Sequence, residues 1–377
     1  MNPARVTTSG LKQVATQACL IPQCRHLVTT STATGIGAVD VTKARQYCQN
    51  QLRHGDYEAY LIRQFVPRSA QDAYDALRTL NLELARLPET VSNATIGHFR
   101  IQFWRDTVNQ IFSGNPPREP ISILLHNAIT GLAERAGVNS VSPLKFWLLR
   151  LINTRGKHME NRPFTSLAAL EDHAENTYAT LMYMTLAAMP LQSVHMDHLA
   201  SHIGKAYGIA ATLRGIPVLA APSQPIHGPS GSSVGTTRSP ALLLPLDVMV
   251  AAGVKEEDVF RRGPNAEGLQ DAVFQVATRA NDHLITAREM LRNLRSGNGP
   301  GHDYEHQTEP EHAYSNLAHG EEDTPAVIQR GFSVLLEAIA VGDYLQRLEK
   351  ANFDPFQVKT SWKLPWSLWR SLKRSEI

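Results

Sequence analysis

The chain has 377 residues, of which 42% are hydrophobic and 19% are charged, and this globular composition is ample for one large core or two domains. The formal net charge of +2 excludes a global field that would attract nucleic acid or acidic partners. The three cysteines, Cys19, Cys24 and Cys48, include no CxxC pair, so a disulfide framework or a zinc finger is not expected.

The first 39 residues contain basic and hydroxyl side chains but no acidic one. Arg5, Lys12 and Arg25 precede the first carboxylate, Asp40, and serine and threonine are abundant. An acid-free, basic, hydroxyl-rich leader is typical of a mitochondrial transit peptide, whereas a secretory signal has a compact apolar core. We therefore predict that residues 1–39 are a mitochondrial transit peptide. A disordered tail without a targeting role is the alternative.

Apolar residues recur at steps of three and four from residue 43 to about residue 350. This spacing places them on one face of each helix, and no convincing strand pattern appears. Clear examples are the stretches 73–87, 199–213, 269–294 and 328–339. We predict an all-α domain over 43–350. Two polar or Pro/Gly/Ser-rich stretches, 222–240 and 297–325, have too little apolar surface to order themselves and are predicted to be flexible insertions.

Residues 356–377 form a basic tail that is rich in tryptophan. Trp362, Trp366 and Trp369 recur at helical spacing, and Lys373 and Arg374 add positive charge. Aromatic rings and cations on a short amphipathic helix are typical of a segment that lies in a membrane interface. A helix docked on the protein's own core is the alternative. No uncharged apolar run reaches the roughly 18 residues of a membrane span, so any attachment should be peripheral.

Histidines gather in two places. His195, His198 and His202 share a helical face, and two histidines one turn apart are able to bind zinc. No glutamate follows in an HExxH pattern, so we favour ordinary surface residues. We expect solvated side chains at the histidines of the polar stretch, His302, His306, His312 and His319, and a solvated acidic helix face at Glu171, Asp172 and Glu175. Neither a metal site nor a cofactor is predicted.

Four segments, in this order, resemble the squalene/phytoene synthase superfamily between about residues 47 and 356. They are LNLELARLPETVSNATIGHFRIQFWRDTV (80–108), LEDHAENTYATLMYMTL (170–186), HIGKAYGIAATLRGIP (202–217) and LLLPLDVMVAAGVKEEDVFRR (242–262). The chain is most similar to the mitochondrial branch of that superfamily, the complex I assembly factors of the assembly factor 6 type. The resemblance implies an isoprenoid-synthase-like bundle of helices around a central cavity.

Enzymes of this superfamily hold magnesium ions on two aspartate-rich motifs, because ionisation of a diphosphate develops negative charge that a metal must neutralise. In this chain the first motif falls on Pro88, Glu89 and Ser92, and the two aspartate positions of the second fall on Gly215 and Leu219. Only one of these five positions is acidic, and residues 198–246 contain no Asp or Glu. The resemblance therefore implies degenerate motifs that hold no magnesium and support no catalysis.

Basic and aromatic side chains are expected to remain around the degenerate site. The candidates are Arg100, Lys205, Tyr207 and Arg214. A cavity that keeps its cations could bind an anionic headgroup or a polyprenyl lipid. We favour the simpler interpretation, in which these cations form structural ion pairs with Glu83, Glu89 or Asp106.

The resemblance implies a non-catalytic mitochondrial assembly factor for respiratory complex I, bound peripherally to the matrix side of the inner membrane. The implied partners are complex I assembly intermediates or other assembly factors, the lipid surface of that membrane, and an isoprenoid or lipid as a candidate ligand; no nucleic acid is expected. The alternative functions are a prenyl- or lipid-binding protein and an active isoprenoid transferase that uses the same cavity.

Overall fold

The computed structural model describes residues 37–91, 93–221, 239–312 and 324–377. These residues form helices joined by turns and coil, without a strand, and the predicted all-α class is confirmed. Most of the predicted leader and Ser92 lie outside the described residues. So do residues 222–238 and 313–323 of the two predicted insertions.

The first half of the described chain folds into a group of packed helices. They are α1 (Ala38–Gly55), α2 (Tyr57–Ile62), α3 (Arg68–Thr90), α4 (Ala94–Phe112), α5 (Pro120–Ala136) and α6 (Ser142–Lys157), with single turns η1 (Arg63–Phe65) and η2 (Val138–Val141) between them. Helix α5 packs on α1 and α3, and α4 packs on α6. Helix α1 begins at Ala38, so its first two residues overlap the predicted leader, 1–39. Helix starts follow local chemistry: the Asn93 side chain accepts a hydrogen bond from the amide of Ile96, and Glu119 caps α5 ahead of Pro120.

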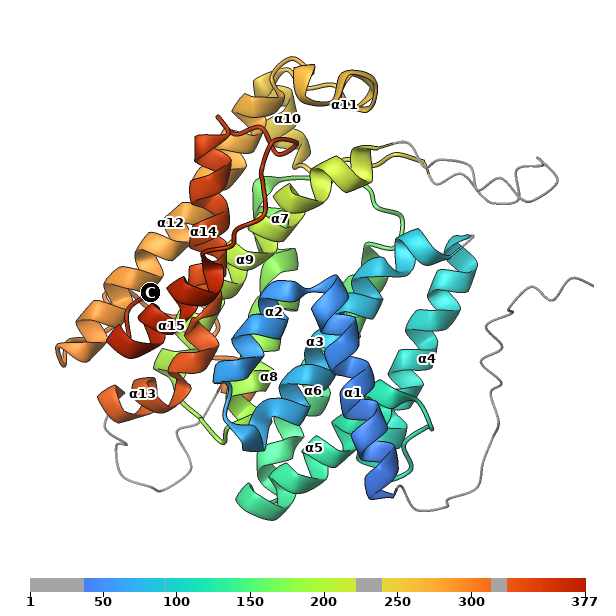
Figure 1. Ribbon diagram of the computed structural model, residues 1–377, viewed down its shortest axis with the longest axis vertical. Coiled ribbons are helices and arrows are strands. Elements are labelled where there is room, and N and C mark those ends of the chain that lie inside the picture. The colour runs from blue at the N-terminus through green and yellow to red at the C-terminus, as the bar shows by residue number, and fades with distance from the viewer. Residues whose placement is uncertain (1–36, 92, 222–238, 313–323) are drawn as a thin grey trace, which may run out of the picture. The chain divides into compact units, whose positions relative to one another are not determined.

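The second half is built around one long helix, α9. Its helices are α7 (Leu167–Ala174), the π-helical turn η3 (Glu175–Ala179), α8 (Thr180–Ala188), α9 (Val194–Ala220), α10 (Leu246–Ala252), α11 (Glu256–Arg262), α12 (Leu269–Arg295), α13 (Thr324–Leu335), α14 (Glu337–Lys350) and α15 (Leu364–Arg374), with short turns η4 (Gly263–Asn265) and η5 (Pro310–His312). Figure 1 shows α9 in the interior, with α12 and α14 on one side and α8 on the other.

Helix α9 forms the centre of the core, and most of its 27 residues are buried. It packs against α7, α8, α12, α13 and α14. Two glycines allow this close packing. A Cβ atom placed on Gly204 would lie 2.3 Å from the Cα of Ala179, and one placed on Gly208 would lie 2.4 Å from the Cβ of Ala174. The small residues of α9 therefore set its distance from α7 and η3.

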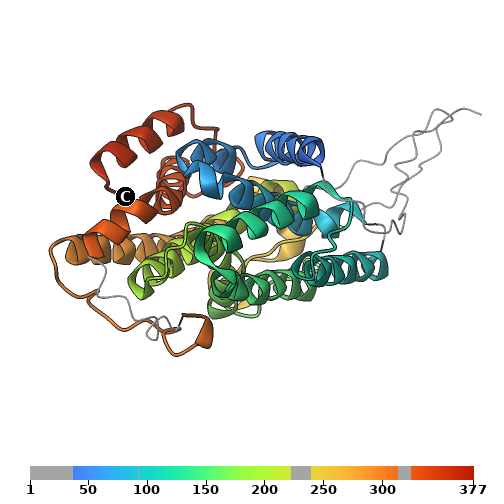
Figure 2. The same cartoon turned by 90° about the horizontal axis from the view of Figure 1, so that it is seen from below.

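Residues 297–312 pack against the bundle, in contrast to the expectation of a flexible insertion. Tyr304 is 5% exposed and His312 is fully buried. The His312 Nδ1 atom lies 2.7 Å from Asp197 Oδ2, and the Tyr304 hydroxyl donates to the Tyr183 hydroxyl at 2.9 Å. Polar partners elsewhere in the fold order this segment, although it carries few large apolar residues. Figure 2 shows its orange coil on the outside of the bundle. We call residues 297–312 the strap.

Helix α15 packs against α14 through its leucines, and its tryptophans face outward. Leu364 and Leu368 are buried, whereas Trp366 and Trp369 are exposed and stack on each other with ring centroids 4.9 Å apart. Trp362 precedes the helix and is 83% exposed. The tail therefore docks on the core, as one alternative proposed, while leaving its aromatic and basic groups accessible.

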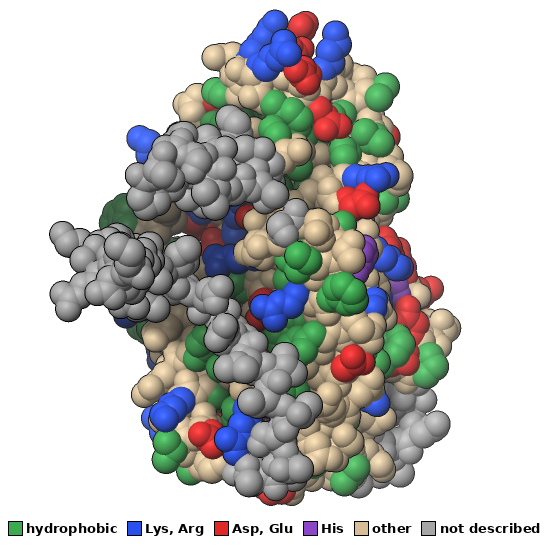
Figure 3. All heavy atoms as spheres, turned by 90° about the vertical axis from the view of Figure 1, so that its right-hand side faces the viewer, with side chains coloured by type: hydrophobic (Ala, Val, Ile, Leu, Met, Phe, Trp, Pro, Cys, Tyr) green, Lys and Arg blue, Asp and Glu red, His purple; other side chains and the backbone are tan. Residues whose placement is uncertain are grey.

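No single helix among the described residues is long and apolar enough to cross a membrane. Helices α13 and α14 together reach the required length and composition, with a bend of 49° between them. On the face shown in Figure 3, acidic and basic side chains are interspersed, in agreement with the small net charge.

Candidate functional site: a polar interior and a histidine cluster

The interior beside α9 contains a fully buried ion pair. Arg78 of α3 and Glu337 of α14 are each 1% exposed, and the Arg78 guanidinium contacts the Glu337 carboxylate directly. The guanidinium also lies over the rings of Tyr74 and Tyr207, at 5.4 and 5.5 Å from their centroids. One opposite charge, on Glu337, and two aromatic faces replace the hydration that Arg78 loses on burial.

A second ion pair lies on the other side of Tyr207. The Arg214 Nη1 atom lies 2.5 Å from Glu58 Oε2, and its guanidinium lies over Tyr344 at 4.6 Å. Burial by itself lowers the pKa of Arg214, but Glu58 and Tyr207 outweigh burial and the pKa is raised. Burial raises the pKa of Tyr207, so this ring stays neutral between the two arginines. Arg214 therefore joins α9 to α2 as a permanent cation.

Asn81 occupies the same inward face of α3 one turn beyond Arg78. It is 4% exposed, and its Oδ1 accepts hydrogen bonds from Arg155 of α6 at 2.8 and 3.2 Å. Arg155 in turn lies over Tyr178, which stacks on Tyr207 at 4.9 Å. The region between α3, α6 and α9 is thus occupied by polar and aromatic side chains of the protein itself.

The positions predicted for the aspartate-rich motifs carry no cluster of carboxylates. Gly215 and Leu219 share a face in the last turns of α9, where a Cβ on Gly215 would lie 3.3 Å from Leu219 Cδ1. Glu89 is exposed in the last turn of α3, and Ser92 lies outside the described residues. At Gly215 and Leu219, α9 therefore carries no side-chain oxygen that could bind a metal.

The four predicted pocket residues separate into three locations. Tyr207 and Arg214 lie together in the interior, with the Arg214 guanidinium 5.6 Å from the centroid of the Tyr207 ring. Lys205 points to another face of α9 and pairs with Glu305 of the strap at 3.0 Å, and Arg100 is exposed on α4. We expected these cations to form structural ion pairs with Glu83, Glu89 or Asp106. Arg214 and Lys205 do form ion pairs, but their partners are Glu58 of α2 and Glu305 of the strap, because the fold brings those elements to α9.

A polar pocket of ≈ 320 Å³ opens on the Lys205 face of α9, between α7, α12 and the strap. Its lining is charged and of both signs: Glu171, Asp172, Glu175, Asp282, Glu305, Lys205, Arg279, His202 and His283 are among the lining residues. A second cavity, between α3, α5, α6 and α8, is apolar and has a volume of only ≈ 10 Å³. That apolar cavity is too small for an isoprenoid chain.

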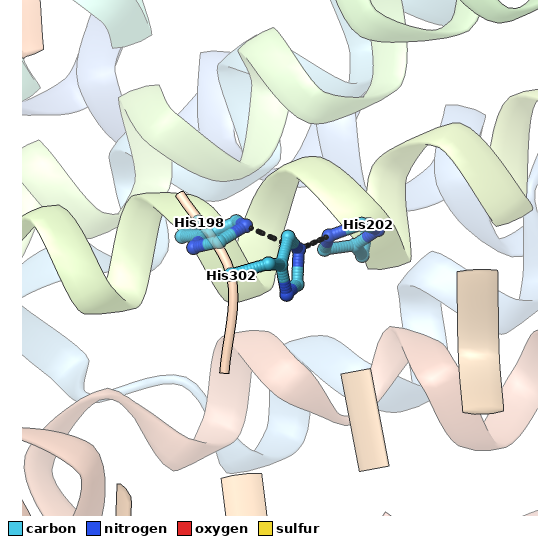
Figure 4. Close-up of side chains that lie close together, drawn as sticks. All are labelled: His198, His202 and His302. Atoms are coloured by element: carbon cyan, nitrogen blue, oxygen red, sulfur yellow. Dashed lines mark hydrogen bonds between the residues drawn. The ribbon is translucent and has the colours of Figure 1, made fainter. Parts of the chain in front are cut away.

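Next to the polar pocket, three histidines converge. His198 and His202 lie one turn apart on α9, and His302 approaches them from the strap (Figure 4). His302 Nε2 lies 2.9 Å from the Nε2 atoms of both His198 and His202. His202 Nδ1 lies 3.1 Å from His283 Nδ1, and His283 Nε2 lies 2.7 Å from Glu171 Oε1. His195, the third histidine of the predicted run, is not a member of this cluster.

Several functional side chains were not predicted, and most had no local signal. His302 reaches the cluster only because the strap packs against α9. Glu175 was expected on a solvated acidic face, but it is 2% exposed and accepts hydrogen bonds from Tyr183 and Ser201 at 2.5 and 2.7 Å. The Arg78–Glu337 pair joins positions far apart in the chain. An arginine in the middle of the apolar stripe 73–87 was the one available signal, because a charged residue on a buried helix face requires a partner.

Known proteins resemble this chain in both sequence and fold. The family model of squalene/phytoene synthase matches residues 52–370. The NADH dehydrogenase (ubiquinone) complex I, assembly factor 6 of Rattus norvegicus is 33% identical over 340 residues, which cover 89% of this chain and 83% of that protein. The Bos taurus protein of the same name is 32% identical over 338 residues, with the same coverage.

Two solved structures share the fold at low sequence identity. Squalene synthase HpnC from Alicyclobacillus acidocaldarius has a TM-score of 0.55 and 13% identity, covering 85% of this chain and 98% of its own. A dehydrosqualene synthase in complex with ligand has a TM-score of 0.57 and 14% identity, covering 89% and 98%. The family model covers most of the chain and the solved structures share its fold, and the chain belongs to the squalene/phytoene synthase family.

Proposed function

We propose that this chain is a non-catalytic assembly factor for respiratory complex I and that it acts in mitochondria. Relatives named as complex I assembly factor 6 match most of the chain at 32–33% identity. Their match extends over four fifths of their own length, so the proposal concerns the whole protein and not one shared module. The acid-free leader at 1–39 supports the same location.

The aligned positions on α9, Gly215 and Leu219, carry no carboxylate, and this observation carries the non-catalytic part of the proposal. Magnesium requires several hard oxygen ligands, and a diphosphate leaving group requires magnesium. Helix α9 offers no carboxylate after Asp197, and the nearby interior cations Arg78 and Arg214 are already bound to Glu337 and Glu58. A protein with this interior keeps the fold of the enzymes as a scaffold.

The exposed tryptophans support peripheral attachment to the matrix face of the inner membrane. Trp362, Trp366 and Trp369 present apolar rings, and the exposed Lys373 and Arg374 add positive charge. Cations near an anionic leaflet contribute about 1 kcal/mol each to binding. Because α15 is docked through Leu364 and Leu368, the bundle itself would rest on the lipid surface.

Deletion of the gene, followed by native-gel separation of the respiratory complexes, tests the proposal directly. We expect complex I to be lost while the other complexes remain, and the wild-type gene to restore it. Glu89→Ala removes the remaining carboxylate of the aligned motifs and should restore complex I equally well. Gly204→Leu disrupts the packing of α9 and should fail to restore complex I. Normal complex I in the deletion strain would refute the proposed function.

The enzymatic alternative is tested with purified protein. With magnesium and farnesyl or geranylgeranyl diphosphate, we expect no release of pyrophosphate. Metal-dependent release at about 1 per second or faster, an ordinary enzymatic rate, would overturn the non-catalytic proposal. A carrier function would instead appear as stoichiometric binding of the isoprenoid without turnover.

The tail proposal has its own test, because Trp366→Ser with Trp369→Ser alters only the outward face of α15. We expect this double variant to keep the wild-type melting temperature and to move from the membrane fraction to the soluble fraction. Leu368→Ala serves as the matched control, since it weakens docking and should lower stability by about 2–5 kcal/mol. A double variant that stays fully membrane-bound would contradict the role of the tryptophans.

A further inference from the structure

The cluster of His198, His202 and His302 has the composition and spacing of a transition-metal site. All three offer a ring nitrogen, and these nitrogens lie within 4.8 Å of one another. Two come from adjacent turns of α9, which is a rigid, buried helix, and the third comes from the strap. Imidazole nitrogen is a preferred ligand of zinc and its neighbours in the first transition row.

Hydrogen bonding alone does not satisfy the three rings. His302 Nε2 lies 2.9 Å from two other Nε2 atoms, one on His198 and one on His202. If His302 Nε2 carries its proton, that proton points to one partner at a time. If it carries the lone pair, two N–H groups compete for it. A cation between the three atoms would accept all three lone pairs at once.

The neighbours of His202 fix the tautomer that a metal requires. Glu171 Oε1 accepts from His283 Nε2 at 2.7 Å, which leaves the lone pair of neutral His283 on Nδ1. That Nδ1 lies 3.1 Å from His202 Nδ1, which therefore donates its proton to His283. The lone pair of His202 is then on Nε2, the atom that faces His302. A carboxylate that orients a ligating histidine through its other nitrogen is a common feature of metal sites.

Burial and charge around the cluster agree with metal binding. His198 is buried, His202 is partly buried beside the pocket, and His302 is exposed at the outer side of the cluster. The nearby cations are already compensated, because Lys205 pairs with Glu305 and Arg279 pairs with Glu171. The polar pocket adjoins His202 and offers space for a water molecule as a fourth ligand.

We propose that His198, His202 and His302 bind one divalent transition-metal ion of the zinc class, with water in the fourth position. Zinc–nitrogen bonds of about 2.0–2.1 Å separate tetrahedral ligands by about 3.3 Å, so the 2.9 Å contacts need to open by only a few tenths of an ångström. The ion would fasten the strap to α9, beside the buried contacts of Tyr304 and His312. This inference stands independently of a role in complex I assembly.

The test uses full-length protein that has been treated with a chelator and then titrated with Zn²⁺ by calorimetry. Co²⁺ serves as a second probe, because its visible spectrum reports tetrahedral nitrogen coordination. We expect one ion per chain and a raised melting temperature with Zn²⁺. His202→Ala and His302→Ala should each lower affinity by more than about 100-fold, and His283→Ala by about 10–100-fold.

Two matched variants separate this site from adventitious binding. His195→Ala removes a histidine from the same helix, and His306→Ala removes one from the strap, and neither belongs to the cluster. Both should bind Zn²⁺ like the wild type. His302 is exposed, so its replacement should leave the fold intact, and the melting temperature without metal checks this. Absence of binding at micromolar Zn²⁺, or equal affinity in His302→Ala, would overturn the proposal.

Discussion

The contact at Gly204 gives a quantitative test of how α9 is packed. Alanine is a better helix former than glycine by about 1 kcal/mol, so Gly→Ala within a helix normally stabilises a protein. At Gly204, however, the new Cβ would lie 2.3 Å from the Cα, 2.4 Å from the N and 2.6 Å from the Cβ of Ala179. Two of these three atoms are backbone, so the helices themselves must separate by about 1 Å to reach ordinary contact distance.

Overpacking of a core costs about 1–3 kcal/mol, and a site walled by backbone lies at the upper end of that range. After subtraction of the helix-propensity gain, we expect Gly204→Ala to destabilise the protein by about 2 kcal/mol. The melting temperature should fall by about 4 °C. Urea unfolding followed by circular dichroism measures the free energy directly.

Gly131 of α5 provides the matched control, because a Cβ there meets only the flexible end of Arg135 at 3.1 Å. Gly131→Ala should stabilise the protein by about 0.5–1 kcal/mol. The two substitutions are chemically identical and should have opposite signs. If Gly204→Ala also stabilises the protein, α9 does not lie against η3 as described here.

Three further experiments test buried or partly buried groups. Glu337→Gln should cost about 3–5 kcal/mol in urea unfolding, because it leaves the charge of Arg78 buried without a partner, whereas Arg78→Met with Glu337→Met together should cost less than either single change. Burial raises the pKa of Glu119 to about 7, so its contribution to stability is present below about pH 4.5 and is lost as pH rises through 7. Glu119→Gln should therefore flatten the dependence of unfolding free energy on pH across that window. An unchanged pH dependence would contradict this. Cys48 is buried, and burial raises the pKa of its thiol to about 12. In a Cys19→Ser, Cys24→Ser background, Cys48 should therefore react with a thiol reagent at pH 8 only after the protein unfolds. Rapid labelling of the native protein would contradict its burial.

Helical periodicity predicted the elements that depend on local sequence. The stripe over 269–294 appears as α12 (Leu269–Arg295), because a repeat of three and four residues buries one face of any helix that packs on a core. At the C-terminus, helical periodicity identified the tryptophan stripe but not the face of α15 that packs on the core. Helix α15 begins at Leu364, after Trp362, and its buried face consists of leucines, so tryptophan spacing alone did not identify the docking surface.

The strap could not be predicted in this way, since its order depends on distant partners. His312 is buried because Asp197 of α9 accepts from it, and Tyr304 is buried beside Tyr183. Composition reports how much apolar surface a segment carries, but not which buried polar groups elsewhere in the fold require a partner. The histidine cluster could not be predicted for the same reason, because His302 reaches α9 only when the strap packs against it.

The charges of the interior arginines are compensated by other side chains of the same chain. In the family's enzymes, magnesium ions and a diphosphate would compensate the charges of a polar interior. Here each described interior arginine has a partner of its own: Glu337 for Arg78, Glu58 for Arg214, and the Asn81 amide for Arg155. Isolated charges would cost several kcal/mol each on burial, so their pairing is a condition for stability. Under the non-catalytic proposal, the side chains of the scaffold itself supply the opposite charges that its buried arginines require.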